Sequence, residues 1–102
     1  MPQTGVTTPS KECRLPMNGD LTSSSVGALR QQFKELIAAG TRELTLDLRA
    51  CMMADSSGIG LLVATHNSLN RLGGTLKLVG VSEDLTQLFH TMRLHQHFSI
   101  QN

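Results

Sequence analysis

The sequence has no Trp and no Tyr, and aromatic residues make up only 3% of it. Stacking platforms for nucleic-acid bases are therefore scarce. Nine Lys and Arg residues are scattered along the chain and balanced by eight Asp and Glu residues, so the formal net charge is +1 and no basic stripe stands ready to neutralise phosphates. This composition argues against direct binding to nucleic acid.

Long hydrophobic runs and cysteine pairs are missing as well. No stretch approaches the roughly 20 apolar residues that span a bilayer, and the opening MPQTGVTTPSKE lacks the apolar core of a signal peptide. Cys13 and Cys51 stand far apart without a CxxC motif, which indicates neither a zinc site nor a disulfide framework. We expect a cytoplasmic protein with no membrane partner, no metal and no other cofactor.

What is present is an alternation of short strand-like and longer helix-like segments within 102 residues, the length of one domain. Residues 1–11 are rich in Thr, Pro, Ser and Gly and predict a mobile tail ahead of a domain over residues 12–102. Apolar periodicity predicts strands near 13–17, 43–48, 75–80 and 98–100, and helices over about 23–39, 57–72 and 83–92. Short returns between them imply parallel neighbours joined by crossovers. The fold class is therefore α/β, with a small, mixed but mostly parallel sheet covered by three or four helices.

Local signals refine this outline. Pro16 confines the first strand to an edge or a bulge, and Asp47 places a carboxylate on the strand face opposite Leu46. The serines of residues 23–25 are candidate caps for the first helix, which Gly40 should end. Ser82 is the candidate cap of the last helix.

The connection RACMMADS after the second strand is longer than the others and leaves the carboxyl end of that strand, where α/β proteins place their sites. It runs into the motif DSSGIG at the start of the next helix. Two interpretations are open. Either Asp55 or Ser56 simply caps the helix while the glycines allow close packing, or the two hydroxyls and the carboxylate form a functional site.

Apolar residues near this motif are open to two interpretations too. At 100° per residue, Leu61 lies roughly opposite the inner stripe of its helix and close to Ser56, as either a docking contact or an ordinary exposed leucine. Met52 and Met53 suit an adaptable interface, but they also suit gap-filling beneath the loop.

The segment LTLDLRACMMADSSGIGLLVATHNSLNRLGGTLKLVGVSEDLTQLFHTMRL resembles the STAS family of bacterial anti-sigma factor antagonists. The matching features occur in order over about residues 41–95: an LDL strand, a small residue before DSSG, IG opening the helix, a GG return, KLVG, and a final LF followed by L. Gly19 and Asp20 also match, whereas Thr22 stands where the family usually has a second carboxylate.

The resemblance implies a STAS-type fold and a phosphorylation-switched binding module that is not an enzyme. The first serine after the aspartate, here Ser56, would be phosphorylated by an anti-sigma serine kinase and restored by a serine phosphatase. The unmodified form would sequester that kinase and so release a sigma factor. The residues expected at the partner surface are Asp55, Ser57, Gly58, Leu61, Met53 and Asp20.

Two alternatives use the same residues differently. One is a STAS scaffold without a switch, in a stress-signalling complex or on the cytoplasmic side of a transporter. The other is a small serine hydrolase with Ser56 as nucleophile, although Ala54 replaces the first glycine of the G-x-S-x-G motif. An unmodified Ser56 in cells would favour the scaffold, whereas ester turnover that is lost in Ser56→Ala would favour the hydrolase.

Overall fold

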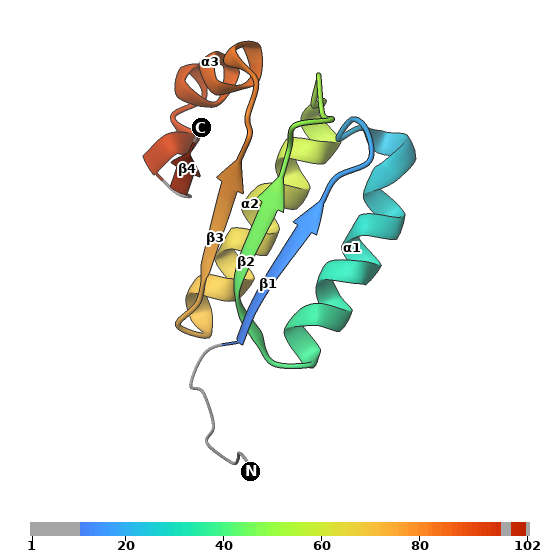
Figure 1. Cartoon of the computed structure of the whole chain (residues 1–102), viewed down its shortest axis with the longest axis vertical. Helices are drawn as coiled ribbons and strands as arrows, with labels where there is room; N and C mark the ends of the chain where they lie inside the picture. Colours follow the sequence, from blue (N-terminus) through green and yellow to red (C-terminus); the bar gives the residue numbers. More distant parts are fainter. Residues whose placement is uncertain (1–10, 97–98, 102) are drawn as a thin grey trace.

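The computed structural model describes residues 11–96 and 99–101. Figure 1 shows strands and helices in alternation along the chain. In chain order they are β1 (Lys11–Pro16), α1 (Ser23–Ala38), β2 (Thr41–Asp47), α2 (Ser56–Arg71), β3 (Thr75–Val79), α3 (Glu83–Thr91), the short 3-10 helix η1 (Leu94–Gln96) and β4 (Ser99–Gln101). Residues 1–10 of the expected N-terminal tail lie outside the described residues, and Lys11 is the first residue of β1. Phe98, at the start of the expected last strand, also lies outside the described residues.

The four strands form one sheet in the order β1-β2-β3-β4, and each described pair is parallel. Leu44 and Leu46 of β2 lie opposite Leu76 and Leu78 of β3, so one face of the central strands is aliphatic. The expected α/β class with three helices is confirmed, and every described strand pair is parallel where a mixed but mostly parallel sheet was expected. In the described sheet β1 is an edge strand that ends at Pro16, where the missing N–H of proline costs no ladder hydrogen bond.

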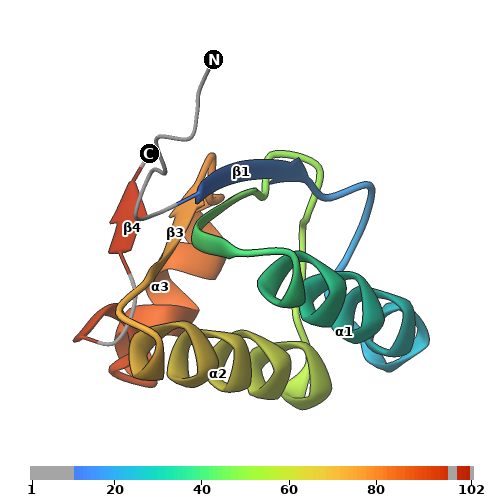
Figure 2. The ribbon, with the colours of Figure 1, turned by 90° about the horizontal axis from the view of Figure 1, so that it is seen from below.

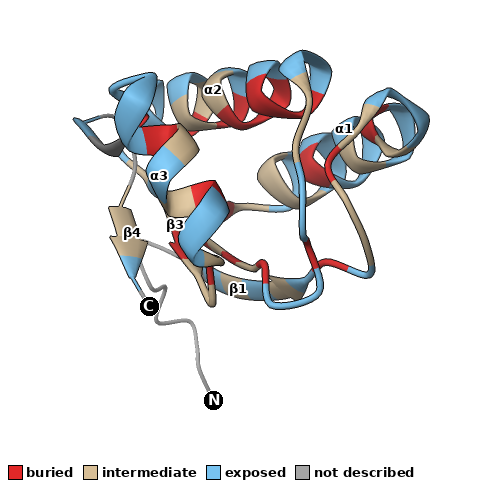
Figure 3. Ribbon diagram, turned by 90° about the horizontal axis from the view of Figure 1, so that it is seen from above, coloured by how far each residue is buried: buried red, intermediate tan, exposed pale blue. Residues whose placement is uncertain are grey.

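Helices α1 and α2 lie side by side and cover one face of the sheet, as Figure 2 shows. The buried positions of both helices are turned towards the sheet and the outer positions are exposed (Figure 3). The core is almost entirely aliphatic, as the low aromatic content requires. Its largest fully buried apolar side chains are Phe33, Phe89, Leu21, Leu44, Leu46, Leu48, Leu62, Leu69, Leu76 and Leu78. Among the described helices, none is long and apolar enough to cross a membrane.

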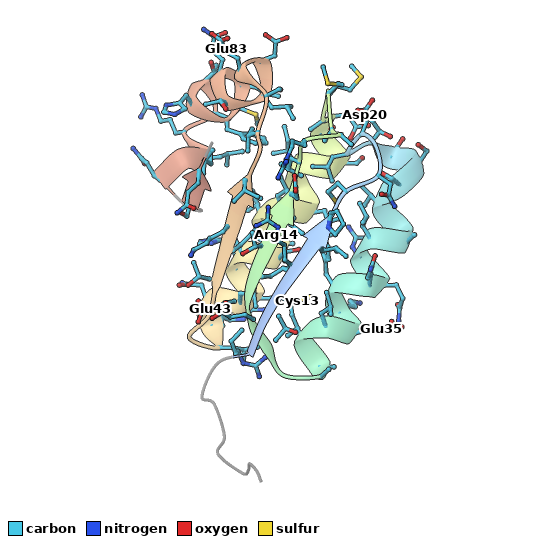
Figure 4. All side chains as sticks on the ribbon, in the orientation of Figure 1. Cys13, Arg14, Asp20, Glu35, Glu43 and Glu83 are labelled. Atoms are coloured by element: carbon cyan, nitrogen blue, oxygen red, sulfur yellow. The ribbon has the colours of Figure 1, made fainter. Side chains whose placement is uncertain are left out.

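The opposite face of the sheet is polar at Asp47, as the alternation in β2 predicts. The Asp47 carboxylate pairs with the guanidinium groups of Arg14 at 3.4 Å and Arg49 at 3.1 Å. Both arginines are largely exposed, and Arg14 is labelled in Figure 4. Hydrogen bonds from Arg49, first of all from its backbone N–H, hold the pKa of Asp47 below its usual value.

Helix α1 begins at Ser23, but its cap is not one of the serines of residues 23–25. Its N-cap is Thr22, and Ser23 to Ser25 form the first turn. The Ser25 hydroxyl accepts a hydrogen bond from the Thr22 N–H at 3.2 Å and lies 2.8 Å from the Asp20 carbonyl oxygen, to which it donates. The serines therefore support the cap from within the helix. At the other end, Gly40 has a positive φ of 108°, which ends the helix as expected.

Candidate functional site

The DSSG motif lies at the carboxyl end of the sheet, where the loop between β2 and α2 runs beside the loop between β1 and α1 (Figure 1). Leu21 and Ala54 form a parallel bridge between the two loops. The Leu21 N–H donates to the Met53 carbonyl at 3.0 Å, and the Asp55 N–H donates to the Leu21 carbonyl at 3.0 Å. Backbone hydrogen bonds thus join two loops that are more than 30 residues apart in the sequence.

Asp55 connects the beginnings of both large helices. As the N-cap of α2 it accepts the Gly58 N–H on one carboxylate oxygen at 3.0 Å. Its other oxygen accepts the N–H of Ser23, the first residue of α1, also at 3.0 Å. These N–H groups, Gly58 first and Ser23 second, hold the pKa of Asp55 below its usual value. The carboxylate is therefore ionised at neutral pH and fixes α2 against α1.

Asp20 makes the reciprocal connection from the other loop, and Figure 4 shows it at this end of the molecule. One oxygen of its half-buried carboxylate accepts the N–H of Met52 at 2.9 Å and the N–H of Met53 at 3.3 Å. Each loop thus supplies one carboxylate to backbone N–H groups of the other. These bonds hold the backbone of the loop before Ser56 from both sides.

Ser56 and Ser57 are the first two residues of α2, and both are exposed. A serine at this position offers its hydroxyl to an incoming enzyme without disturbing the core. The amino end of a helix favours negative charge, because its first N–H groups have no partner within the helix. The arrangement is chemically suited to accept a phosphoryl group and to tolerate the product.

The loop before α2 contains three sulfur-containing residues, of which Cys51 is buried and Met52 and Met53 are exposed. Cys51 is fully buried, and its thiol lies 3.4 Å from the Met53 carbonyl oxygen, to which it donates. Burial raises the pKa of this thiol, so it stays protonated and serves as a packing group. Met52 and Met53 are 67% and 59% exposed, so they do not fill a gap beneath the loop. Of the two interpretations of these methionines, the second is wrong.

Two residues expected at the partner surface are buried. Gly58 has no room for a side chain, because a Cβ there would collide with the Leu21 carbonyl group. Its role is close packing of α2 on the first loop, and its expected place in a contact surface is wrong.

Leu61 is only 2% exposed, so the expectation that it lies on the open side of α2 is also wrong. It borders a small cleft between α1 and α2 together with Phe33 of α1. Helix α2 therefore buries residues against α1 as well as in the rest of the core, whereas the helical angle argument assumed a single buried stripe.

The remaining predicted site residues converge. Four of them lie around the start of α2: Met53, Asp55, Ser56 and Ser57. Asp20 lies beside them in the loop between β1 and α1. Sequence reasoning missed the backbone of Ser23, which Asp55 holds. No local signal could have found it, because the partners are 32 residues apart. The match at Gly19 and Asp20 did indicate that the first loop takes part.

The chain is similar to known proteins of one family. A family model described as "Mlab, STAS domain" matches residues 4–101. The "Anti-sigma-B factor antagonist" of Staphylococcus aureus (strain NCTC 8325 / PS 47) is 31% identical over 83 residues, which cover 81% of this chain and 77% of that protein. The chain belongs to the STAS domain family.

Two solved structures share the fold. The crystal structure of a putative anti-sigma factor antagonist from Thermotoga maritima has a TM-score of 0.84 at 22% identity and covers 89% of this chain and 79% of its own. The structure of a sulfate transporter family protein from Wolinella succinogenes has a TM-score of 0.77 at 18% sequence identity. The match covers 88% of this chain and 75% of the transporter family protein's chain. The same fold therefore occurs in a protein described as a putative anti-sigma factor antagonist and in one described as a sulfate transporter family protein.

Proposed function

We propose that the chain is an anti-sigma factor antagonist whose binding is switched by phosphorylation of Ser56. In the unmodified form it binds an anti-sigma serine kinase, and the sigma factor held by that kinase is released. The kinase phosphorylates Ser56 and the two proteins separate. A serine phosphatase removes the phosphate and restores binding.

The observation that carries this proposal is the exposed Ser56 hydroxyl at the start of α2, directly after the Asp55 cap. The relative from Staphylococcus aureus is named as an antagonist of an anti-sigma factor, which supports the choice of partner. Its similarity to this chain extends over 81% of the sequence, so the support applies to most of the chain.

Phosphorylation of Ser56 would change binding while leaving the fold intact. The phosphate adds about −1.5 to −2 charges at neutral pH. At the exposed start of a helix this charge meets favourable backbone dipoles and water, so the folded state tolerates it. In a protein contact packed without it, the same charge loses its hydration and finds no compensating partner, which weakens the complex.

The proposed partner surface is centred on Ser56 and includes the exposed Ser57 and Met53. Asp55 and Asp20 lie at its base and are half-buried. Since both carboxylates are engaged by backbone N–H groups, their contribution to the surface is mainly to support it.

The test uses the full chain and the purified serine-kinase anti-sigma factors encoded by the organism that makes it. Wild type, Ser56→Ala and Ser56→Asp are compared for capture of each kinase, and intact mass after incubation with ATP reports phosphorylation. We expect wild type and Ser56→Ala to bind, Ser56→Asp to be released, and only wild type to gain one phosphate. Ser57→Ala identifies the modified hydroxyl, because it removes the neighbouring exposed hydroxyl and should still gain one phosphate.

Other outcomes would select the alternatives. Equal capture of Ser56→Ala and Ser56→Asp, with no phosphate gained by wild type, would remove the switch and leave a constant scaffold. Ester hydrolysis that is lost in Ser56→Ala would indicate a serine hydrolase instead.

A further inference from the structure

The two most exposed large apolar side chains of the described residues are neighbours, Met52 at 67% and Met53 at 59%. They lie in the loop that leads to Ser56, only three and four residues before it. The other exposed large apolar residues, Leu72 and Met92, lie elsewhere at 49% and 47% and follow the last residues of α2 and α3. An adjacent exposed pair next to a modifiable serine is a distinct feature of this surface.

This exposure does not come from a loosely held loop. The backbone N–H groups of Met52 and Met53 both donate to one oxygen of Asp20, at 2.9 and 3.3 Å. The Met53 carbonyl accepts from the Leu21 N–H at 3.0 Å, and both Leu21 and Cys51 are fully buried under the loop. The backbone is thus anchored from below while the two thioether side chains extend into solvent.

A pre-ordered backbone lowers the entropic cost of forming a contact. Methionine side chains are unbranched and polarisable, so they fit apolar pockets of irregular shape. The anchoring oxygen belongs to Asp20, which lies in the other loop and contacts the backbone of the pair. Its expected role at the partner surface is therefore indirect.

We infer that Met52 and Met53 form an apolar docking pair that inserts into an apolar pocket of the anti-sigma kinase, and that Asp20 is the positioning residue that holds the pair in place. The inference rests on the proposed function and adds the chemistry of the contact. The kinase must carry this pocket beside the site that receives Ser56, because the pair and the serine belong to one short segment.

The docking pair is tested with the double variant Met52→Gln/Met53→Gln, which keeps the length of both side chains and changes only exposed atoms. Against the kinase captured by wild type, we expect the dissociation constant to rise roughly tenfold or more. In steady-state phosphorylation of Ser56, KM should rise similarly while kcat stays unchanged, because docking precedes the chemical step. Met92→Gln is the control and should change the dissociation constant less than about twofold.

Asp20 is tested with Asp20→Ala and Asp20→Asn. Alanine removes the acceptor, so we expect weaker docking together with altered amide resonances and faster amide exchange at Met52 and Met53. Asparagine keeps an oxygen in place and should restore both properties. A merely structural role elsewhere would not single out these two amides.

The outcomes separate this inference from the proposed function. If the double methionine variant binds as tightly as wild type while Ser56→Asp is released, the docking pair is refuted and the switch stands. An equal loss in Met92→Gln would also overturn the inference, because the effect would not be local. If wild type binds none of the kinases, both ideas fail.

Discussion

Helices α2 and α3 begin with the same local chemistry, yet only the start of α2 has the features of a site. Asp55 caps α2 by accepting the Gly58 N–H at 3.0 Å, and Ser82 caps α3 by accepting the Leu85 N–H at 3.1 Å. The difference is that Asp55 has a second oxygen, which reaches Ser23 in α1. The Ser82 cap only starts α3, whereas the Asp55 cap starts α2 and also binds the backbone of α1, so that the surface around Ser56 includes residues from both connections.

The connections that lead to the two helices differ in the same way. Only residues 80–82 separate β3 from α3, whereas residues 48–55 separate β2 from α2. The longer loop would be free to vary if it were not bonded to residues 20–23. The extra length provides the exposed surface, and the cross-loop bonds hold its backbone in place.

The largest effect should come from Leu61, which is buried where α2 meets α1. Leu61→Ala should lower the free energy of unfolding by about 2–5 kcal/mol, because it leaves a cavity between the helices. Urea denaturation monitored by circular dichroism measures this. Leu72→Ala is the control, since Leu72 is 49% exposed. Similar small losses in both variants would contradict the two-sided packing of α2.

Gly58 provides the next test, because it occupies the position in α2 that Leu85 occupies in α3. Gly58→Ala forces a methyl group against the Leu21 carbonyl and should cost about 1–3 kcal/mol of unfolding free energy. Gly60→Ala meets no atom within 4 Å and should be neutral or stabilising by up to about 1 kcal/mol. Thermal and urea unfolding of the two variants should therefore shift in opposite directions, and a shared direction would refute the close approach.

The two caps can be compared directly. Ser82→Ala should cost about 1 kcal/mol, the usual loss for a helix cap. Asp55→Ala should cost more, because it also leaves the Ser23 N–H of α1 without its partner. Hydrogen exchange should accelerate at Ser23 in the Asp55 variant and remain unchanged there in the Ser82 variant. Equal losses, with Ser23 unaffected in both, would show that Asp55 is only a local cap.

The smallest expected effect is on pH dependence. The pKa of folded Asp55 is lowered from 3.8, so its stabilising contribution is fully present above about pH 5 and is lost as the pH falls through the folded pKa. Urea unfolding at pH 6 and pH 3 should show a smaller drop in stability for Asp55→Asn than for wild type. Ser82→Ala should keep the wild-type drop, because a hydroxyl does not titrate in this range. An unchanged drop in Asp55→Asn would contradict the assigned bonds.

Periodicity predicted the elements of this fold well where one face of each decides burial. The alternation around Leu44, Leu46 and Asp47 located β2 and its polar face, and Pro16 limited β1 to an edge or a bulge, of which the sheet order selects the edge. The prediction from periodicity was wrong at Leu61, because α2 packs against α1 as well as against the sheet. A helical wheel identifies one apolar stripe and does not include a second neighbouring element. Residue type placed the first cap on the serines instead of Thr22, because both Ser and Thr cap helices and Ser is the more favoured of the two.

The DSSG motif located the start of α2 and its two candidate caps, Asp55 and Ser56, because these residues are adjacent along the chain; the structure identifies Asp55 as the cap. The arrangement around them came from folding. Asp20 meets the Met52 and Met53 amides, and Asp55 meets Ser23, only after parallel strands bring the ends of β1 and β2 together. Short-range hydrogen bonds and burial patterns are encoded locally, whereas contacts across 30 residues depend on the register of the sheet and on which helices lie side by side.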